Sequence, residues 1–165
     1  TSLASGAIDA AEWICPVADL GLGMHQAAKF YYGPGWHEPS TLLDLSIDLK
    51  EWEGLDADTQ ALMMEMAKAF NVDVFSRFQA LNGPALGKLL NEHGVQLKTF
   101  PDELLIALGN AAGEVMEERG SIDSQTKAIC NHILSFRKNI MDWSTKGESE
   151  FARIRNLPFK FPDSV

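Results

Sequence analysis

The strongest periodic pattern in the chain is helical and lies near its centre. Between residues 57 and 81, apolar side chains recur at intervals of one, three and four residues, at Leu62, Met63, Met66, Ala67, Phe70 and Val74. This spacing is typical of one face of an α-helix, and Asp56 before it is a favourable N-cap. We predict a long amphipathic helix over residues 57–81, with the cluster of Met63, Met64 and Met66 in a core.

A break is expected after this helix. Asn82, Gly83 and Pro84 should end or kink it, because proline lacks an N–H donor and crowds the preceding turn. The helical pattern resumes over residues 85–92 as far as Gly94, a typical C-cap residue. A short strand is predicted over residues 95–100.

The first third of the chain shows strand-like segments. Residues 7–11 read as extended, and Asp19 is the predicted N-cap of a helix over residues 20–28. Residues 29–32 are rich in strand-forming side chains and precede a turn at residues 33–35. Residues 41–48 alternate apolar and acidic or hydroxyl side chains, which predicts another strand before a helical turn at residues 49–53.

The second half is predicted to be mostly helical. A helix should run from Asp102 to about Arg119, where Gly120 stops it, and Ser121 should cap a further helix to about Thr145. Residues 157–162 contain two prolines and should be a non-helical tail whose aromatic side chains pack on a neighbouring surface. Because the few strands lie near the front, a β-rich core would need partners that this chain does not supply.

Composition narrows the classes of function. The 165 residues are 45% hydrophobic and 22% charged, as in ordinary globular proteins, and no apolar run could cross a membrane. The net charge of −9 makes nucleic acid an unfavourable partner.

Residues 1–6 do not resemble a signal peptide, so an export signal would lie upstream. Cys15 and Cys130 lack metal-type spacing and are expected to be unpaired and mostly buried.

Two segments carry candidate chemistry. Glu12 and Trp13 follow the first extended segment, where a carboxylate and a backbone carbonyl could face a cleft and bind a hard cation. The alternative is a solvated glutamate beside a core tryptophan. Trp36, His37 and Glu38 lie in an aromatic, glycine-rich loop that suits a pocket rim, or else packs on its own domain.

No enzymatic motif is present. The sequence lacks GxSxG, a phosphate-binding loop, HExxH and a GxGxxG after a strand. His25 and His93 are expected on the surface, and His132 is expected to be partly buried.

The segments GAIDAAEW at residues 6–13 and GWHEP at residues 35–39 resemble the solute receptors of TRAP transporters, the DctP superfamily. Together with EWICP at residues 12–16, they are most similar to the subgroup that binds 2-oxo acids or lactate with a metal ion. The resemblance extends over essentially the whole chain.

The resemblance implies an α/β, periplasmic-binding-protein-like receptor with two lobes. Residues 1–165 would be its carboxy-terminal portion, mainly helical with a few strands, contributing to both lobes, with the amino-terminal half absent. In the family, an arginine that grips the substrate and a glutamine that completes the metal shell lie in that half. The chain alone is therefore expected to bind ligand poorly.

The resemblance also implies the roles of the site residues. The Glu12 side chain and the Trp13 carbonyl would hold a sodium or calcium ion against the substrate carboxylate. Trp13, Trp36, His37 and Glu38 would line the cleft for a small 2-oxo or 2-hydroxy monocarboxylate, a small organic acid anion.

The implied setting is the periplasm, with TRAP membrane subunits as partners, no covalent chemistry, and a possible homodimer through residues 121–161. One alternative is a helical interaction or dimerisation module without a small ligand, using residues 57–81 and the helix of Trp143. A metal-dependent lyase or hydrolase acting through Glu12 and His37 is disfavoured, because no acid–base pair at a suitable spacing is evident.

Overall fold

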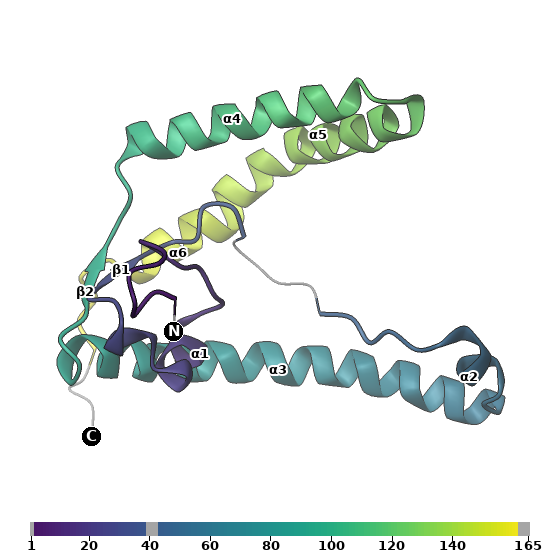
Figure 1. Ribbon diagram of the computed structural model, residues 1–165, viewed down its shortest axis with the longest axis horizontal. Coiled ribbons are helices and arrows are strands. Elements are labelled where there is room, and N and C mark those ends of the chain that lie inside the picture. The colour runs from purple at the N-terminus through teal and green to yellow at the C-terminus, as the bar shows by residue number, and fades with distance from the viewer. Residues whose placement is uncertain (1, 39–42, 162–165) are drawn as a thin grey trace. The chain divides into compact units, whose positions relative to one another are not determined.

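The computed structural model describes residues 2–38 and 43–161, and Figure 1 labels their helices and strands. The chain divides into two compact units, Thr1–Pro101 and Asp102–Val165. The elements of the first unit are α1 (Pro16–Leu22), the 3-10 turn η1 (Met24–Gln26), β1 (Phe30–Tyr32), α2 (Leu49–Glu53), α3 (Ala57–Asn91) and β2 (Gln96–Lys98). Those of the second are α4 (Asp102–Gly120), α5 (Ser124–Ser144), the π-helical turn η2 (Thr145–Ser149) and α6 (Glu150–Arg155).

Helix α1 differs from the prediction, because Asp19 lies inside it and not at its start. The helix begins at Pro16, whose fixed φ suits a first helical position. It ends at Gly23, which has a φ of 71° and whose N–H reaches the carbonyls of Asp19 and Leu20. The predicted helix over residues 20–28 is therefore wrong, since a left-handed glycine interrupts it.

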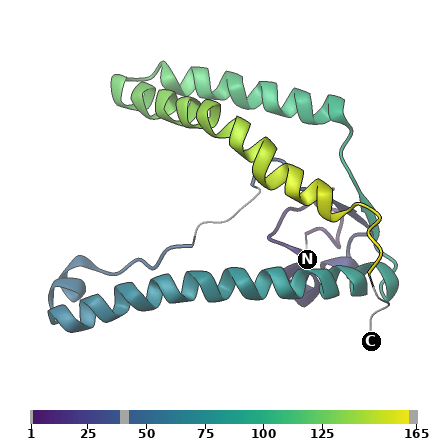
Figure 2. The same cartoon turned by 180° about the vertical axis from the view of Figure 1, so that it is seen from behind.

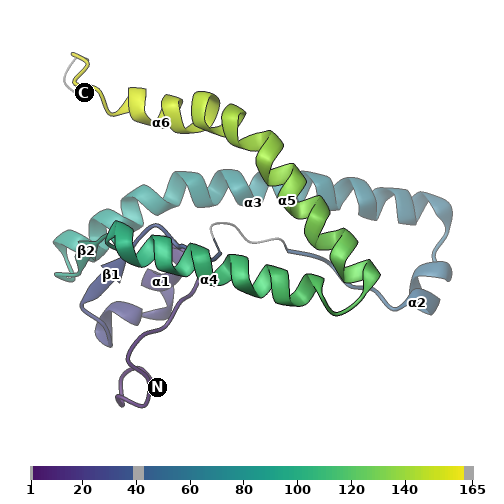
Figure 3. The ribbon, with the colours of Figure 1, turned by 90° about the horizontal axis from the view of Figure 1, so that it is seen from above.

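The amino end of α1 is bound to α3 by a side chain. Cys15 provides no side-chain cap, and the N–H of Val17 instead donates to Oδ1 of Asn82 at 3.2 Å. Figures 1 and 3 both show α1 against the half of α3 that leads towards β2. Asn82 thus satisfies an N–H group that has no partner within its own helix.

Helix α3 is one element of 35 residues that continues through Pro84. Its start is as predicted, because Asp56 accepts hydrogen bonds from the N–H and hydroxyl of Thr59. Of the end or kink predicted at residues 82–84, the end is wrong: Pro84 costs one backbone hydrogen bond, but the helix packs against α1 there and buries Ala85 beyond it.

The C-cap of α3 is Glu92, two residues before the predicted C-cap Gly94. Gly94 adopts a φ of 66°, and the N–H of Val95 reaches back to the carbonyl of Leu89 at 3.0 Å. This hydrogen bond satisfies the Leu89 carbonyl in the last turn of α3 from a residue beyond the helix. It turns the chain directly into β2.

Strands β1 and β2 pair in parallel, with Tyr31 opposite Leu97. Parallel strands need a long crossover, which the segment containing α2 and α3 supplies. Both strands were predicted, although each is shorter than its predicted range.

Strand β1 is joined to α1 by a hydrogen bond between side chains. The hydroxyl of Tyr31 donates to Oδ2 of Asp19 at 2.5 Å, and Asp19 is only 6% exposed. Burial raises the pKa of Asp19 above its ordinary value, and the hydrogen bond from Tyr31 partly opposes that shift. Burial and the same hydrogen bond raise the pKa of Tyr31.

Two predicted strands are not formed. Residues 7–9 are bends and residues 10–11 are irregular, because no described segment lies alongside to pair with their backbone. Of the strand predicted at residues 41–48, residues 41 and 42 lie outside the described part, and residues 43–48 are exposed and irregular. The helical turn predicted at residues 49–53 is confirmed as α2, with Asp48 accepting from two backbone N–H groups.

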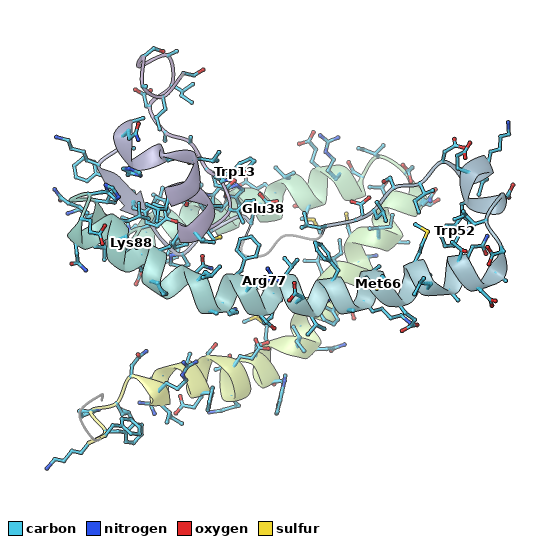
Figure 4. All side chains as sticks on the ribbon, turned by 90° about the horizontal axis from the view of Figure 1, so that it is seen from below. Trp13, Glu38, Trp52, Met66, Arg77 and Lys88 are labelled. Carbon is cyan, nitrogen blue, oxygen red and sulfur yellow. The ribbon has the colours of Figure 1, made fainter. Side chains whose placement is uncertain are left out.

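The apolar face of α3 does not form a core within the described chain. Phe70 is 62% exposed and Met66 is 61% exposed, and Figure 4 shows Met66 on α3 between Arg77 and the end near Trp52. The prediction that the methionine cluster lies in a core is therefore wrong for the first unit, since no other described element of that unit covers it. The buried apolar side chains among the described residues are Ala85, Leu89, Val95 and Cys130.

The second unit is a helical hairpin followed by a bent extension. Figures 1 and 2 show α4 and α5 side by side, joined by a short turn. Asp123 caps α5 by accepting from the N–H and hydroxyl of Thr126, so the predicted cap at Ser121 is wrong. Asp123 lies nearer the first helical residue and has Thr126 at the N3 position.

The helical path continues beyond the predicted end near Thr145, because η2 and α6 extend it to Arg155. Residues 157–161 are non-helical as predicted, and residue 162 lies outside the described part. Phe159 and Phe161 are exposed and contact each other edge to face. Cys15 and Cys130 are both free, as predicted, with Cys130 buried and Cys15 half-buried.

The bond between Asn82 and α1 predicts a change in stability. Asn82→Ala should lower the free energy of unfolding by about 1 kcal/mol relative to Asn71→Ala, because loss of a helix-capping acceptor costs about that much. Asn71 is exposed in the same helix, so it reports the change in helix propensity alone. Asn82→Asp keeps an acceptor and should stay close to wild type. Equal urea midpoints for the two alanine variants would contradict the prediction.

The burial of Asp19 predicts a pH dependence. Because its folded pKa is raised, the folded state holds this proton more tightly than the unfolded chain, whose aspartates titrate near pH 4. The contribution of Asp19 to stability is therefore complete below about pH 4 and is lost as pH rises through the folded pKa. Urea unfolding of wild type and Asp19→Asn across this window should show their stability difference changing in that direction. Parallel curves would contradict it.

Candidate functional site

Glu12 and Trp13 lie on an irregular segment that leads into α1. Residues 10–13 belong to no helix or strand. In the described part of the chain, no N–H or side chain donates a hydrogen bond to the carbonyl of Trp13. This carbonyl is therefore available to another partner, as a cation ligand must be.

Trp36, His37 and Glu38 lie on the loop that follows β1. Strand β1 ends at Tyr32, and the N–H of Gly33 extends its pairing by donating to the carbonyl of Lys98 at 3.0 Å. The rings of Trp36 and His37 lie 4.8 Å apart and are tilted by 45°. The loop thus leaves the sheet with its aromatic and ionisable side chains close together.

The fold brings the two segments together at their ionisable groups. One ligand atom each from Glu12, His37 and Glu38 lies within 4.8 Å of the other two. Nε2 of His37 is 3.8 Å from Oε2 of Glu12, a pair that attracts when the imidazole is protonated. Residues 25 positions apart in the sequence therefore form one cluster.

The chemistry of these donors favours a hard cation. Sodium and calcium are bound mainly by carboxylate and carbonyl oxygens, and Glu12, Glu38 and the Trp13 carbonyl offer such atoms. Imidazole nitrogen suits softer metals, so His37 fits better as a hydrogen-bonding group for a ligand. Two carboxylates this close repel each other, and a cation between them removes that repulsion.

The cluster is open to solvent in the described chain. The side chains of Glu12 and His37 are 47% and 41% exposed, while Trp13 and Trp36 are 50% and 44% exposed. Trp13 is thus not a core tryptophan, and the loop of Trp36 is not packed away. Both aromatic side chains remain available to line a ligand site.

The structure changes the interpretation of one residue. Glu38 was assigned to the substrate by resemblance, and its carboxylate now lies beside that of Glu12. Figure 4 shows Trp13 and Glu38 in the same region of the first unit, far along α3 from Trp52. The position of Glu38 beside His37 on a glycine-rich loop indicated a role in a site. The sequence alone could not predict that its carboxylate would lie next to that of Glu12.

The other histidines lie elsewhere. The ring of His25, half-buried on η1, stacks on that of His93 with centroids 4.0 Å apart. His93 is exposed as predicted, whereas His132 is exposed and not partly buried. None of the helices in the described ranges is long and apolar enough to span a bilayer.

Comparisons with a family profile and with a known protein both identify solute-binding proteins as similar to this chain. The sequence profile of bacterial extracellular solute-binding protein family 7, DctP, matches residues 1–121. A monocarboxylate 2-oxoacid-binding periplasmic protein of Nostoc sp. is 35% identical over 150 residues, which are 91% of this chain and 41% of that protein.

Solved structures show the same likeness. A TRAP periplasmic solute-binding protein from Pseudoalteromonas atlantica, with bound sodium and pyruvate, aligns with a TM-score of 0.84 and 29% identity, covering 96% of this chain and 47% of that one. A TRAP solute-binding protein from Bordetella bronchiseptica, a dimer with calcium and picolinate, aligns at 0.83 and 29%, covering 93% and 46%.

The chain thus spans less than half the length of these relatives. The α/β receptor fold predicted from the sequence, represented here by helices and a small parallel sheet, is confirmed.

Proposed function

Because the chain belongs to family 7 of the bacterial extracellular solute-binding proteins, we propose that it forms part of a TRAP transporter receptor. The whole receptor binds a small 2-oxo or 2-hydroxy monocarboxylate together with a sodium or calcium ion. The observation that carries this proposal is the meeting of Glu12, His37 and Glu38 at ligand distances. The relatives that bind pyruvate with sodium and picolinate with calcium support it.

Each residue has a distinct role in the proposal. Carboxylate oxygens of Glu12 and Glu38 and the carbonyl of Trp13 hold the cation. The cation neutralises the carboxylate of the ligand, which would otherwise be costly to remove from water. His37 offers a hydrogen bond to a polar ligand atom, and the rings of Trp13 and Trp36 limit the shape of the ligand. None of these roles involves covalent chemistry, so the receptor binds its ligand and releases it unchanged.

The described cluster supplies only part of a binding site. Calcium takes six to eight oxygen ligands in proteins, which is more than Glu12, Glu38 and the Trp13 carbonyl offer. The side chains of Glu12, His37 and Glu38 are also exposed. We propose that residues 1–165 are the carboxy-terminal portion of the receptor and contribute to both of its lobes, while other parts supply the remaining ligands and close the site. The chain alone should then bind pyruvate more weakly than the whole receptor, and isothermal titration can compare the two.

Loss of the Glu12 carboxylate predicts weaker binding. In the whole receptor, Glu12→Gln should weaken pyruvate binding in the presence of sodium or calcium by about 10- to 150-fold, since an interaction with a charged group contributes about 1.5 to 3 kcal/mol. Glu38→Gln should act in the same direction. Isothermal titration at several concentrations of each cation gives the measurement.

Glu53→Gln is the matched control, because Glu53 is an exposed carboxylate on α2 outside the cluster. It should bind pyruvate as wild type does. The proposed cation role would be contradicted if Glu12→Gln bound pyruvate with wild-type affinity. It would also be contradicted if the affinity of wild type for pyruvate did not depend on the concentration of the cation.

The proposed setting is the periplasm, where the receptor delivers its ligand to TRAP membrane subunits. The Nostoc relative is named as periplasmic, which supports this location. A homodimer through residues 121–161 is part of the proposal, and the Bordetella structure is a dimer. Phe136 and Trp143 on α5 are more than 60% exposed, so this helix presents apolar surface to a second copy.

Light scattering of the whole receptor should give twice the mass of one chain, and a monomer would contradict the dimer.

The alternative function, a helical interaction module without a small ligand, rests on the same exposed side chains. It predicts no thermal shift with pyruvate and a cation, whereas the receptor should be stabilised by a ligand that binds its folded state.

A further inference from the structure

The two segments that form the candidate site are both attached to secondary structure close by. Glu12 lies four residues before Pro16, the first residue of α1. His37 lies five residues after Tyr32, the last residue of β1. The relative position of α1 and β1 therefore sets where the two segments begin and how near their carboxylates can come.

A single side-chain hydrogen bond joins these two elements. The Tyr31 hydroxyl donates to Oδ2 of Asp19 at 2.5 Å, and among the described residues no other side-chain hydrogen bond links α1 with β1. Asp19 comes from the middle of α1 and Tyr31 from the middle of β1. The bond thus ties the body of each element and not a frayed end.

Asp19 is also the one buried polar or charged side chain within the described residues. Its second oxygen, Oδ1, is buried and has no hydrogen-bond partner there. An unpaired buried oxygen costs free energy, so Asp19 is an expensive choice for a position that needs only to fill space. The hydrogen bond from Tyr31 offsets part of this cost, because it gives the buried carboxylate a partner at its other oxygen.

We infer that Asp19 and Tyr31 are positioning residues that hold Glu12 in register with His37 and Glu38. Neither touches the cation or the ligand. Their bond fixes the middle of α1 against β1, so that the segment before α1 and the loop after β1 meet. This inference rests on the proposed function for its effect on binding, but not for its effect on the geometry of the apo protein.

The strand supplies a matched control. Tyr32 is the next residue on β1, and its ring stacks on Phe100 with centroids 4.8 Å apart. Its hydroxyl makes no hydrogen bond with the part of the chain that the structure describes. Tyr31→Phe and Tyr32→Phe thus remove the same atom from neighbouring positions, and only the first breaks the link to Asp19.

The test uses the whole receptor with 5-fluorotryptophan in place of tryptophan. Tyr31→Phe should weaken cation-dependent pyruvate binding by about three- to tenfold, as expected for one lost hydrogen bond. It should also shift or broaden the fluorine resonance of Trp36 in the absence of ligand. Tyr32→Phe should leave both readouts at wild-type values. Asp19→Asn keeps an acceptor for the Tyr31 hydroxyl and should stay close to wild type, whereas Asp19→Ala should behave like Tyr31→Phe.

The outcomes separate positioning from simple stabilisation. If Tyr31→Phe lowers only the thermal midpoint, and binding by the folded protein and the Trp36 resonance are unchanged, the positioning role is overturned. If wild type shows no cation-dependent pyruvate binding, the proposed function fails, but the resonances of Trp36 in the two phenylalanine variants still decide the positioning role. Binding is measured well below the midpoint of each variant, so that unfolding does not imitate loss of affinity.

Discussion

The structure of the first unit depends on burial at the carboxy-terminal end of α3. Ala85 and Leu89 are buried on that helix, and Val95 is buried just after the turn into β2. Helix α1 packs on the same half of α3, and β1 pairs with β2 directly beyond the turn. Apolar burial is the main stabilising term available to a chain, and here it is concentrated at one point. The segments that carry the candidate site start from the elements gathered there.

The site combines donors on irregular segments with elements that are held together by side-chain hydrogen bonds. Glu12 and Glu38 lie on irregular backbone, which allows their oxygens to adjust to a cation of variable coordination such as calcium. The elements behind them are held by side-chain bonds, from Asn82 to the start of α1 and from Tyr31 to Asp19. A binding loop on a rigid scaffold is a common arrangement in proteins. It explains how exposed, irregular segments can still present their donors at defined separations.

Local signals in the sequence predicted the start of α3 at an exposed aspartate, but the left-handed Gly23 at the end of α1 and the aspartate cap of α5 at Asp123 were missed. Asp56 caps the start of α3, as expected, whereas the C-cap is Glu92, two residues before the predicted Gly94. Other predictions failed because contacts between distant segments decided the outcome. Helix α3 passes Pro84, where it packs against α1. The strand expected at residues 7–11 needs a backbone partner that no described segment offers, and the strand pattern at residues 43–48 meets the same obstacle.

Asp19 shows why the candidate site could be predicted only in part. Asp19 lies three residues after Pro16 and just before an apolar run, so its neighbours in the sequence predict a helix cap. Its burial instead follows from the packing of α1 on α3 and from the hydrogen bond with Tyr31. The meeting of Glu12 with Glu38 depends likewise on β1, which is placed by pairing with a strand more than 60 residues later. No local pattern reports such a pairing. The resemblance of the motifs to a known family could name the residues, but their mutual distance follows only from the fold.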